Sequence, residues 1–366
     1  MMMSFWEKQL LDEYDFLVVG AGIMGCSVAF ELREKYANAK IGIIERDYFS
    51  CGASTKNAGF ACFGSPTEIL HDIQLMGEQN ALELVRKRYE GLQILTNRIA
   101  DAGRTNLGGY ELMLQDTLSK SEIQSLNEIL FPIFKQTVFV DASKQIHAFQ
   151  FSNIAQMIYT AFEAQVDSGK LLTAYWQLLQ SKNIRFFNGL TVKKLLRNEI
   201  EAESSLNGNI TCRANKIFIC TNAFPIDTSF KLPIKPGRGQ VLITSPIEGL
   251  PFSGSFHFDA GFYYFRNVGN RVLFGGGRNL DFTSEETTDF APNQLILDDL
   301  KLKLKEIILS NFSFSIEQEW QGIMAFSENK LPLIHSMNQY ATYLMACNGM
   351  GVALCPFVAK EIVDQL

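Results

Sequence analysis

The chain has 366 residues, enough for one large domain or two. Hydrophobic residues make up 47% and charged residues 20%, which excludes a disordered, collagen-like or coiled-coil protein. The 33 basic and 39 acidic side chains give a net charge of −6 with no long basic run. Binding to nucleic acid or to an anionic membrane surface therefore has no electrostatic basis in this sequence.

The chain also lacks the patterns of metal-binding, secreted and membrane-spanning proteins. Its seven cysteines form no CxxC pair, so no metal site is predicted and free thiols in a reducing, cytoplasmic location are expected. The N-terminus has no basic segment followed by an apolar one, so no secretory signal is expected. The longest uncharged stretch, 341–359, is interrupted by Asn348, Gly349, Gly351 and Pro356. We therefore expect no integral membrane segment.

The N-terminal segment predicts a β-α-β unit. An apolar strand, Asp15–Val19, leads into the turn GAGIMG (20–25), a helical pattern follows to about Tyr36, and a second strand, Ile41–Ile44, ends at Glu45. This context makes a GxGxxG turn informative for dinucleotide binding. The first glycine permits the tight turn, the second lets a pyrophosphate approach the backbone, and the third allows close helix–strand packing. Glu45 lies 20 residues after Gly25, where a carboxylate would accept hydrogen bonds from ribose hydroxyls.

The following segments alternate between helical and strand patterns until the texture changes near residue 233. The predicted helices are 67–100, 121–133 and 168–182, and the predicted strands are 108–114, 184–187 and 216–220. From 233 to 320 the predicted strands are 240–245, 256–266, 271–276 and 313–321, with one long helix at 293–309. The last segment, 343–366, returns to strand, glycine-rich turn and helix. These patterns predict an antiparallel sheet domain inserted into a nucleotide-binding domain.

Four further motifs follow the N-terminal turn in a characteristic order. They are GASTKNAGF (52–60), FICTNA (218–223), KPGRGQ (235–240) and CNGMGVAL (347–354). Together with GAGIMG they resemble the FAD-dependent oxidoreductases of the D-amino acid oxidase family, over nearly the whole chain. The resemblance implies an α/β fold with a Rossmann-like FAD-binding domain of the glutathione-reductase type and an inserted antiparallel-sheet α/β substrate domain. The expected boundaries are 13–80, 150–228 and 320–366 for the FAD-binding domain, and 81–149 and 229–319 for the substrate domain.

The resemblance implies non-covalently bound FAD and a set of cofactor-binding residues. A glycine-rich turn before the last helix would supply N–H groups to the flavin edge where negative charge develops on reduction. Ser54 and Asn57 could hold the pyrophosphate or the ring edge. The full expected set is Gly20, Gly22, Ile23, Met24, Gly25, Glu45, Arg46, Ser54, Thr55, Asn57, Ala58, Gly59, Phe60, Val192, Thr221, Asn222, Ala223, Gly322, Asn348, Gly349, Met350, Gly351 and Val352.

One position separates this chain from the amino acid oxidases of the family. Where those relatives carry a carboxylate-binding arginine after Trp-x-Gly, this chain has Met324, and a thioether cannot form the bidentate pair that a carboxylate prefers. The segments Trp320–Pro332 and Ala164–Lys170 look more like the gamma-glutamylputrescine oxidase branch, whose members oxidise amines without a neighbouring α-carboxylate. The candidate catalytic or pocket residues are Tyr264, Arg266, Arg278, Met324 and Lys330. Each has a structural alternative: sheet packing for the tyrosine, and a salt-bridged or solvated surface position for the basic residues.

The predicted function is FAD-dependent oxidation of the C–N bond of a small amine, by hydride transfer to flavin N5 and hydrolysis of the imine product. A D-amino acid or glycine oxidase or dehydrogenase is the alternative. A non-enzymatic flavin-binding redox sensor remains open, and a nicotinamide dehydrogenase would not need the later motifs. The electron acceptor is oxygen or another molecule.

Overall fold

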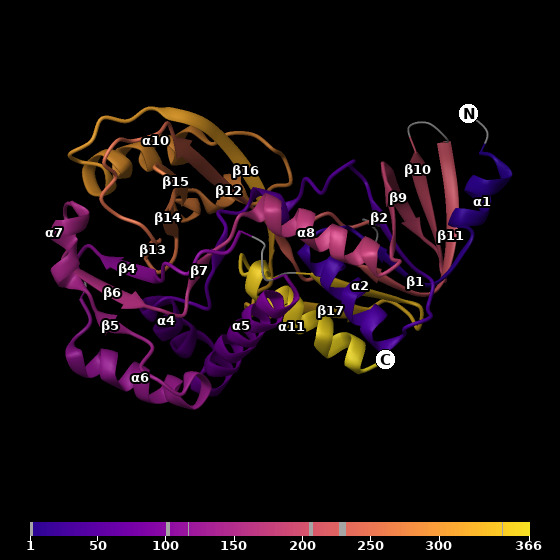
Figure 1. The fold of residues 1–366 in the computed structure, drawn as a ribbon, viewed down its shortest axis with the longest axis horizontal. Coiled ribbons are helices and arrows are strands. Elements are labelled where there is room, and N and C mark those ends of the chain that lie inside the picture. The colour runs from indigo at the N-terminus through magenta and orange to yellow at the C-terminus, as the bar shows by residue number, and fades with distance from the viewer. Residues whose placement is uncertain (1–2, 100–102, 116, 205–207, 227–231, 346) are drawn as a thin grey trace.

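The computed structural model describes residues 3–99, 103–115, 117–204, 208–226, 232–345 and 347–366. Two eight-stranded sheets lie side by side, each with parallel and antiparallel pairs, and long helices pack between and below them (Figure 1). Among the described helices, none is long and apolar enough to cross a membrane. All seven cysteines are free.

The first sheet contains the predicted β-α-β unit. Its strands run in the order β17 (Leu333–Ser336), β18 (Ala341–Met345), β11 (Gly208–Ile219), β1 (Glu13–Val19), β2 (Ile41–Glu45) and β8 (Arg185–Asn188), with β9 (Leu190–Leu195) and β10 (Glu199–Ser204) attached to β11. The pairs from β18 to β8 are parallel, whereas β17 and the β9–β10 hairpin are antiparallel. The parallel strands are apolar and buried, as expected for a sheet covered on both faces.

Helices cover one face of this sheet. They are α2 (Ile23–Lys35), α5 (Glu78–Arg98), α8 (Ser168–Ser181) and α11 (Gly351–Asp364), and all four contribute side chains to the core that contains Val18 and Ile43. α5 packs closely on α11 because Gly91 has no side chain: a Cβ there would lie 1.9 Å from the Ala353 carbonyl oxygen. The other face carries a separate core beneath the β9–β10 hairpin and α1 (Phe5–Leu11).

The second sheet forms the other half of the molecule. Its order is β16 (Ile316–Phe326), β12 (Lys235–Thr244), β15 (Arg271–Gly276), β14 (Tyr263–Val268), β13 (Ser255–Phe258), β4 (Gly109–Met113), β6 (Gln156–Thr160) and β5 (Val140–Asp141). All pairs are antiparallel except β13–β4. An aromatic core on one face packs against α7 (Ile146–Phe149) and α10 (Gln294–Lys303), while α4 (Pro66–Met76) and α6 (Lys120–Phe134) enclose a further core. The remaining short elements are α3 (Ala53–Lys56), α9 (Phe282–Glu285), the 3-10 turns 143–145 and 278–280, and the strand pair β3 (Phe60–Ala61) and β7 (Ala164–Gln165).

Three predicted elements differ from the structure. The strand predicted at 256–266 is two strands, β13 and β14, because Asp259, Ala260 and Gly261 all adopt positive φ and turn the chain. The helix predicted at 67–100 is broken into α4 and α5 at Gly77, whose φ is 82°; its predicted end, residue 100, lies outside the described residues. The helix predicted at 293–309 is α10 followed by a π-helical turn, Leu304–Ile308.

The domain boundaries expected from the sequence do not follow the two sheets. β6, inside the segment 150–228, and β16, which begins before 320, both belong to the second sheet. α5, inside the segment 81–149, packs on α11 over the first sheet. The boundary at 228/229 lies among residues that the structure does not describe. We therefore propose that β6 and β16 belong to the substrate unit and that α5 belongs to the cofactor unit.

Candidate functional site

The glycine-rich turn after β1 has the close approaches that the sequence predicts. Gly20 has a φ of 102°, and a Cβ there would lie 2.7 Å from the Cys220 carbonyl oxygen at the end of β11. A Cβ at Gly25 would lie 1.9 Å from the Gly20 carbonyl oxygen. Neither position can carry a side chain without moving backbone, so the turn brings the start of α2 directly against the ends of β1 and β11.

Glu45 lies at the end of β2, as predicted, but its carboxylate already has partners in the chain. The side chain is buried, Oε2 accepts a hydrogen bond from the Ala21 N–H at 2.9 Å, and Oε1 accepts one from the Asp47 N–H at 3.3 Å. A carboxylate oxygen has a second lone pair. Glu45 can therefore organise the turn and also accept a ribose hydroxyl.

Ser54 lies in α3, and its side chain contacts the first residues of α2. Its hydroxyl accepts a hydrogen bond from the Ile23 N–H at 2.9 Å, and a Cβ at Gly22 would lie 2.8 Å from that oxygen. Gly22 is the N-cap residue and has no side-chain acceptor to offer to the N–H groups of the first turn. The helix start therefore provides N–H donors and the positive end of the helix dipole for an anion.

Asn57 holds the loop 52–60 in shape. Its Nδ2 donates to the Ala53 and Ser54 carbonyls, and its Oδ1 accepts from the Gly59 N–H at 2.8 Å and from the Ser168 hydroxyl at 2.8 Å. Thr55 donates its hydroxyl to the Ser50 carbonyl at 2.8 Å. The loop is thus fastened both internally and to the start of α8, with Ala58 and Phe60 packed against the second sheet.

The segment 221–223 lies at the end of β11, beside the glycine-rich turn. The Thr221 hydroxyl is buried and has no hydrogen-bond partner among the described residues. Asn222 has a φ of 54° and donates from Nδ2 to the Ile323 carbonyl at 3.0 Å, and Ala223 packs against Ile323. A buried, unpaired hydroxyl next to the turn indicates a polar group that a ligand can satisfy.

Two further predicted cofactor residues lie at the edges of this region. The Arg46 guanidinium stands 4.5 Å from the centre of the Phe224 ring, one residue beyond the segment 221–223. Val192 lies in β9 and packs against the core that contains Ile44, near the end of β2. Whether either residue contacts the cofactor stays a prediction.

The glycine-rich turn before α11 is positioned by β16. Asn348, with a φ of 51°, accepts hydrogen bonds at Oδ1 from the Ser327 N–H at 2.8 Å, and its own N–H donates to Ala325. Gly349 has a φ of 83°, and α11 then begins with the N-cap Met350 and no side-chain cap. As in α2, the first turn offers N–H groups and the helix dipole to an electron-rich group.

β16 also carries the two residues that seat the loop 52–60. The Trp320 indole N–H donates to the Lys56 carbonyl at 3.0 Å, and a Cβ at Gly322 would lie 3.3 Å from the Lys56 Cβ. The motif Trp-x-Gly thus has a structural role in this chain, because both of its named residues contact Lys56 in the loop 52–60. It brings α3 against the same face of the second sheet that carries the substrate-pocket candidates.

These residues fit a dinucleotide cofactor. Two helix starts without N-cap side chains, at α2 and α11, lie at the two glycine-rich turns, and the unpaired Thr221 hydroxyl and the Glu45 carboxylate lie at the ends of β11 and β2. The donors suit a pyrophosphate and a flavin edge, and the carboxylate suits ribose hydroxyls.

Three of the five candidate pocket residues gather over glycines of the second sheet. Gly237 and Gly239 are two apart on β12 and pair with Met324 and Gly322 on β16, so all four share one face. A Cβ at Gly239 would lie 3.2 Å from the Met324 Cε and 3.7 Å from the Tyr264 hydroxyl. A Cβ at Gly237 would lie 3.2 Å from an Arg278 Nη atom.

The face formed by Gly237, Gly239 and Gly322, called the glycine floor from here on, is bounded by the turn before α11 and by aromatic rings. The Met324 sulfur lies 3.7 Å from the position of a Cβ at Gly349. The Tyr264 ring lies across Gly275 and makes an edge contact with Phe60 at 5.8 Å. Burial raises the pKa of the Tyr264 phenol to about 12, so the hydroxyl stays protonated at neutral pH and can donate. Tyr263, next to it on the same strand, points the other way and donates to Asp299 at 2.8 Å.

Arg278 contributes the positive charge at this floor. Its Cζ atom lies 3.9 Å from the centre of the Phe326 ring and 4.8 Å from the centre of the Phe282 ring. Burial lowers the pKa of the Arg278 guanidinium. It makes no hydrogen bond or ion pair with the part of the chain that the structure describes. The nearest acidic group that affects it, Glu285, is itself fully buried and ion-paired with Arg238 at 2.7 Å.

The other two candidates have different partners. Arg266 is buried on β14, and one Nη atom donates to the Gly59 carbonyl at 2.6 Å and to the Val166 carbonyl at 2.9 Å. Burial lowers its pKa to about 10. Lys330 forms an ion pair with the buried carboxylate of Asp72 at 2.5 Å. Arg266 therefore fastens the loop 52–60 to the second sheet, and Lys330 ties the segment after β16 to α4.

Sequence reasoning missed a buried polar cluster behind Phe60. The ligand atoms of Cys62, Glu163 and His257 lie within 4.8 Å of one another and could hold a metal ion. His257 Nε2 and Glu163 Oε2 are 3.1 Å apart. Burial opposes protonation of the imidazole, but the charge and hydrogen bond of Glu163, together with the charges of Glu68 and Glu111, outweigh it and raise the pKa of His257. The three positions are far apart in the chain, so no sequence spacing could have indicated them.

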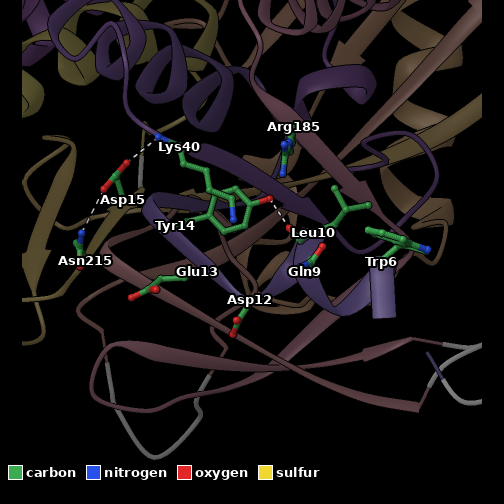
Figure 2. Close-up of a pocket in the computed structure, with 10 residues that line it drawn as sticks. All are labelled: Trp6, Gln9, Leu10, Asp12, Glu13, Tyr14, Asp15, Lys40, Arg185 and Asn215. Carbon is green, nitrogen blue, oxygen red and sulfur yellow. Dashed lines mark hydrogen bonds between the residues drawn. The ribbon is translucent and has the colours of Figure 1, made fainter. Parts of the chain in front are cut away.

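A surface depression of about 860 Å³ lies away from all these residues, at the far end of the first sheet (Figure 2). Figure 2 shows internal contacts across it: the Tyr14 hydroxyl donates to the Leu10 carbonyl at 2.7 Å, and the Lys40 N–H donates to Asp15 at 2.7 Å. The Lys40 ammonium also stands 4.4 Å from the centre of the Tyr14 ring. This surface depression contains no predicted site residue, so we assign it no part in the chemistry.

The fold and the two glycine-rich turns define a protein with a candidate dinucleotide site beside a second sheet. Comparison with known families gives the same class: residues 15–365 match the family described as FAD dependent oxidoreductase, abbreviated DAO. The chain belongs to this family, and its cofactor is FAD.

Individual relatives are distant. The chain is 19% identical to the bifunctional protein ThiO/ThiG of Nostoc sp. (strain PCC 7120) over 363 residues, which cover 96% of this chain and 52% of that protein. It thus spans about half the length of this relative. Among solved structures it is similar to L-proline dehydrogenase from P. horikoshii, with a TM-score of 0.75, 16% identity, and coverage of 97% of this chain and 93% of that chain. Glycine oxidase from Geobacillus kaustophilus gives a TM-score of 0.69, 17% identity and coverage of 97% and 95%. These likenesses establish the shared fold.

Proposed function

We propose that this protein oxidises the C–N bond of a small amine that lacks a carboxylate on the reacting carbon. When bound, FAD supplies the acceptor for the hydride that leaves this carbon. The imine product then hydrolyses in water. The bound electrons pass to oxygen or to another acceptor.

The observation that carries the proposal is the composition of the glycine floor next to the turn before α11. The residue that faces Gly239 and Gly349 is Met324, whose thioether offers no charged partner to an α-carboxylate. Arg266 cannot replace it without abandoning its two backbone carbonyl partners, Gly59 and Val166. A carboxylate buried here without a cation would be costly.

The residues around the floor also favour the reactive, neutral form of an amine. Met324 and Phe60 supply apolar surface that excludes water, and the Arg278 charge disfavours a second cation nearby. The Tyr264 hydroxyl can donate a hydrogen bond to an amine nitrogen or to another substrate acceptor. No side-chain base is required if the amine binds unprotonated.

Oxidation of an α-amino acid is the second candidate, because solved structures of similar fold carry the names L-proline dehydrogenase and glycine oxidase. In that case Arg278, one of whose Nη atoms lies 3.2 Å from the position of a Cβ at Gly237, would have to bind the carboxylate.

Anaerobic flavin reduction separates the two candidates. The FAD-loaded protein is mixed in a stopped-flow instrument with matched pairs, each an amine and its α-carboxylated analogue, and bleaching of the flavin absorbance is followed. We expect the amines to reduce the flavin faster by on the order of a hundredfold or more in kcat/KM. Faster reduction by glycine, D-alanine or L-proline than by every simple amine would refute the proposal. Admitting oxygen after reduction then tests whether oxygen is the acceptor.

A further inference from the structure

Arg278 is a desolvated cation that faces the substrate floor. Its guanidinium lies next to the rings of Phe282 and Phe326, and one of its Nη atoms lies 3.2 Å from the position of a Cβ at Gly237, a position that the Phe326 ring approaches more closely, at 2.3 Å. The acidic side chains that influence it are committed elsewhere: Glu285 to Arg238, and Glu286 to Lys235 at 3.1 Å. Within the described residues it has no anionic partner of its own, and a half-buried guanidinium on aromatic rings is well suited to bind one.

The glycine floor also sets the distance between the Arg278 charge and the site at Tyr264 and Met324. The Met324 Cε and the Tyr264 hydroxyl lie next to Gly239, whereas the Phe326 ring and an Arg278 Nη atom lie next to Gly237, two residues away on the same face of β12. A two-residue step along a strand is about 7 Å. An extended chain covers about 1.25 Å per bond, since three bonds span about 3.8 Å. A carboxylate held by Arg278 is therefore separated from a carbon at the Tyr264–Met324 end by roughly four to six bonds.

We propose that Arg278 binds a carboxylate at the far end of the substrate, so that the substrate is an amine with an anionic group remote from the reacting carbon. This inference rests on the proposed function. It assigns the positive charge at Gly237 to recognition of the substrate's tail and the apolar Met324 to the carbon that is oxidised. The class that fits is that of ω-amino carboxylates with a chain of about five to seven carbons.

The chain-length series tests the geometry in the FAD-loaded wild-type protein. The amines are glycine, 3-aminopropanoate, 4-aminobutanoate, 5-aminopentanoate, 6-aminohexanoate and 8-aminooctanoate, each compared with the alkylamine of the same chain without the carboxylate. We expect the ratio of kcat/KM, amino acid over alkylamine, to be largest at 5-aminopentanoate or 6-aminohexanoate, by about 10- to 100-fold. A ratio of one or below at every length would overturn the inference and leave amine oxidation itself intact. Absence of flavin reduction by every amine in the series except glycine, with rapid reduction by glycine or another α-amino acid, would instead overturn the proposed function.

Substitution at position 278 tests the residue. In Arg278→Met the ratio at the preferred length should fall to near one, and Arg278→Lys should give an intermediate value because it keeps the charge but not the planar fork. Arg271→Met is the matched control: this arginine begins β15, the strand that leads to Arg278, and forms an ion pair with Glu317 at 2.8 Å at the surface. An unchanged ratio in Arg278→Met would refute the role.

A binding measurement gives an independent readout. Hexanoate and adipate, which carry no oxidisable amine, should perturb the flavin absorbance spectrum on binding to the wild-type protein. Their dissociation constants should rise about 10- to 100-fold in Arg278→Met and stay unchanged in Arg271→Met. Equal binding by the wild-type protein and Arg278→Met would overturn the inference.

Discussion

Glu45 offers a sharp test of the dinucleotide site because its carboxylate already accepts two hydrogen bonds from the chain. These come from the Ala21 N–H at 2.9 Å and the Asp47 N–H at 3.3 Å. Glu45→Gln keeps the size of the side chain and one carbonyl oxygen for the turn, but it removes the negative charge and one acceptor. Glu45→Ala removes the acceptors for both N–H groups as well.

The two substitutions should therefore differ. Losing charge-assisted hydrogen bonds to the ribose should cost about 1.5–3 kcal/mol, or roughly a 10- to 100-fold loss of FAD affinity, in both variants. Glu45→Ala should in addition lower the free energy of unfolding of the apoprotein by about 1–3 kcal/mol, because the Ala21 N–H is buried and loses its acceptor. The chemistry of flavin that does bind should be unchanged.

Titration of apoprotein with FAD, followed by flavin fluorescence, measures the affinity, and urea unfolding of the apoprotein measures the stability. Glu34→Gln is the control, since Glu34 is exposed on α2 and forms an ion pair with Lys182 at 2.7 Å. Wild-type FAD affinity in both Glu45 variants would show that Glu45 does not bind the cofactor. Reduced stability with unchanged affinity would restrict it to organising the turn.

Three further predictions concern the substrate site, the cofactor linkage and the buried cluster. Met324→Arg should shift the preference of the enzyme toward α-amino acids, measured as the ratio of flavin reduction rates for glycine and methylamine; no shift in a variant that retains FAD would contradict the assigned position. The FAD should be held without a covalent bond, since the segment 322–330 contains no cysteine, and acid precipitation should leave all of the flavin in the supernatant; a yellow pellet would disprove this. The raised pKa of His257 predicts that its pairing with Glu163 stabilises the fold fully below about pH 6.5 and that this contribution is lost as the pH rises through the raised pKa. Urea midpoints of the apoprotein between about pH 6 and 9 should fall more steeply for the wild-type protein than for Glu163→Gln; parallel curves would count against the ion pair.

Local sequence patterns were enough to predict the cofactor half of the fold. The apolar run 15–19, the GxGxxG turn and the strand ending at Glu45 follow one another in a short part of the chain, and they form one β-α-β unit in which β1 pairs with β2. The same holds for the turn before α11, where Gly349 adopts the positive φ that a glycine-rich turn indicates. The strand period of two by itself places Tyr264 and Arg266 on one face.

The partners of the site residues were decided by tertiary structure. No local pattern indicates that Arg266 binds the Gly59 and Val166 carbonyls, or that Lys330 pairs with Asp72, because these contacts join segments more than 90 residues apart. The break of the predicted strand 256–266 was missed for a related reason. Asp259 and Ala260 take positive φ against their own preference, so the turn is imposed by the packing of β13 and β14 around it.

The sequence by itself therefore determined the class of cofactor and the residue types available at the site, since both depend on short motifs whose backbone geometry is local. It also contained the G-x-G spacing of 237–239, which places two glycines on one strand face. Only the tertiary structure decided which side chains face those glycines. Met324, Tyr264 and Arg278 come from three different strands or strand ends, and they meet because the second sheet pairs β16, β12, β15 and β14 in that order.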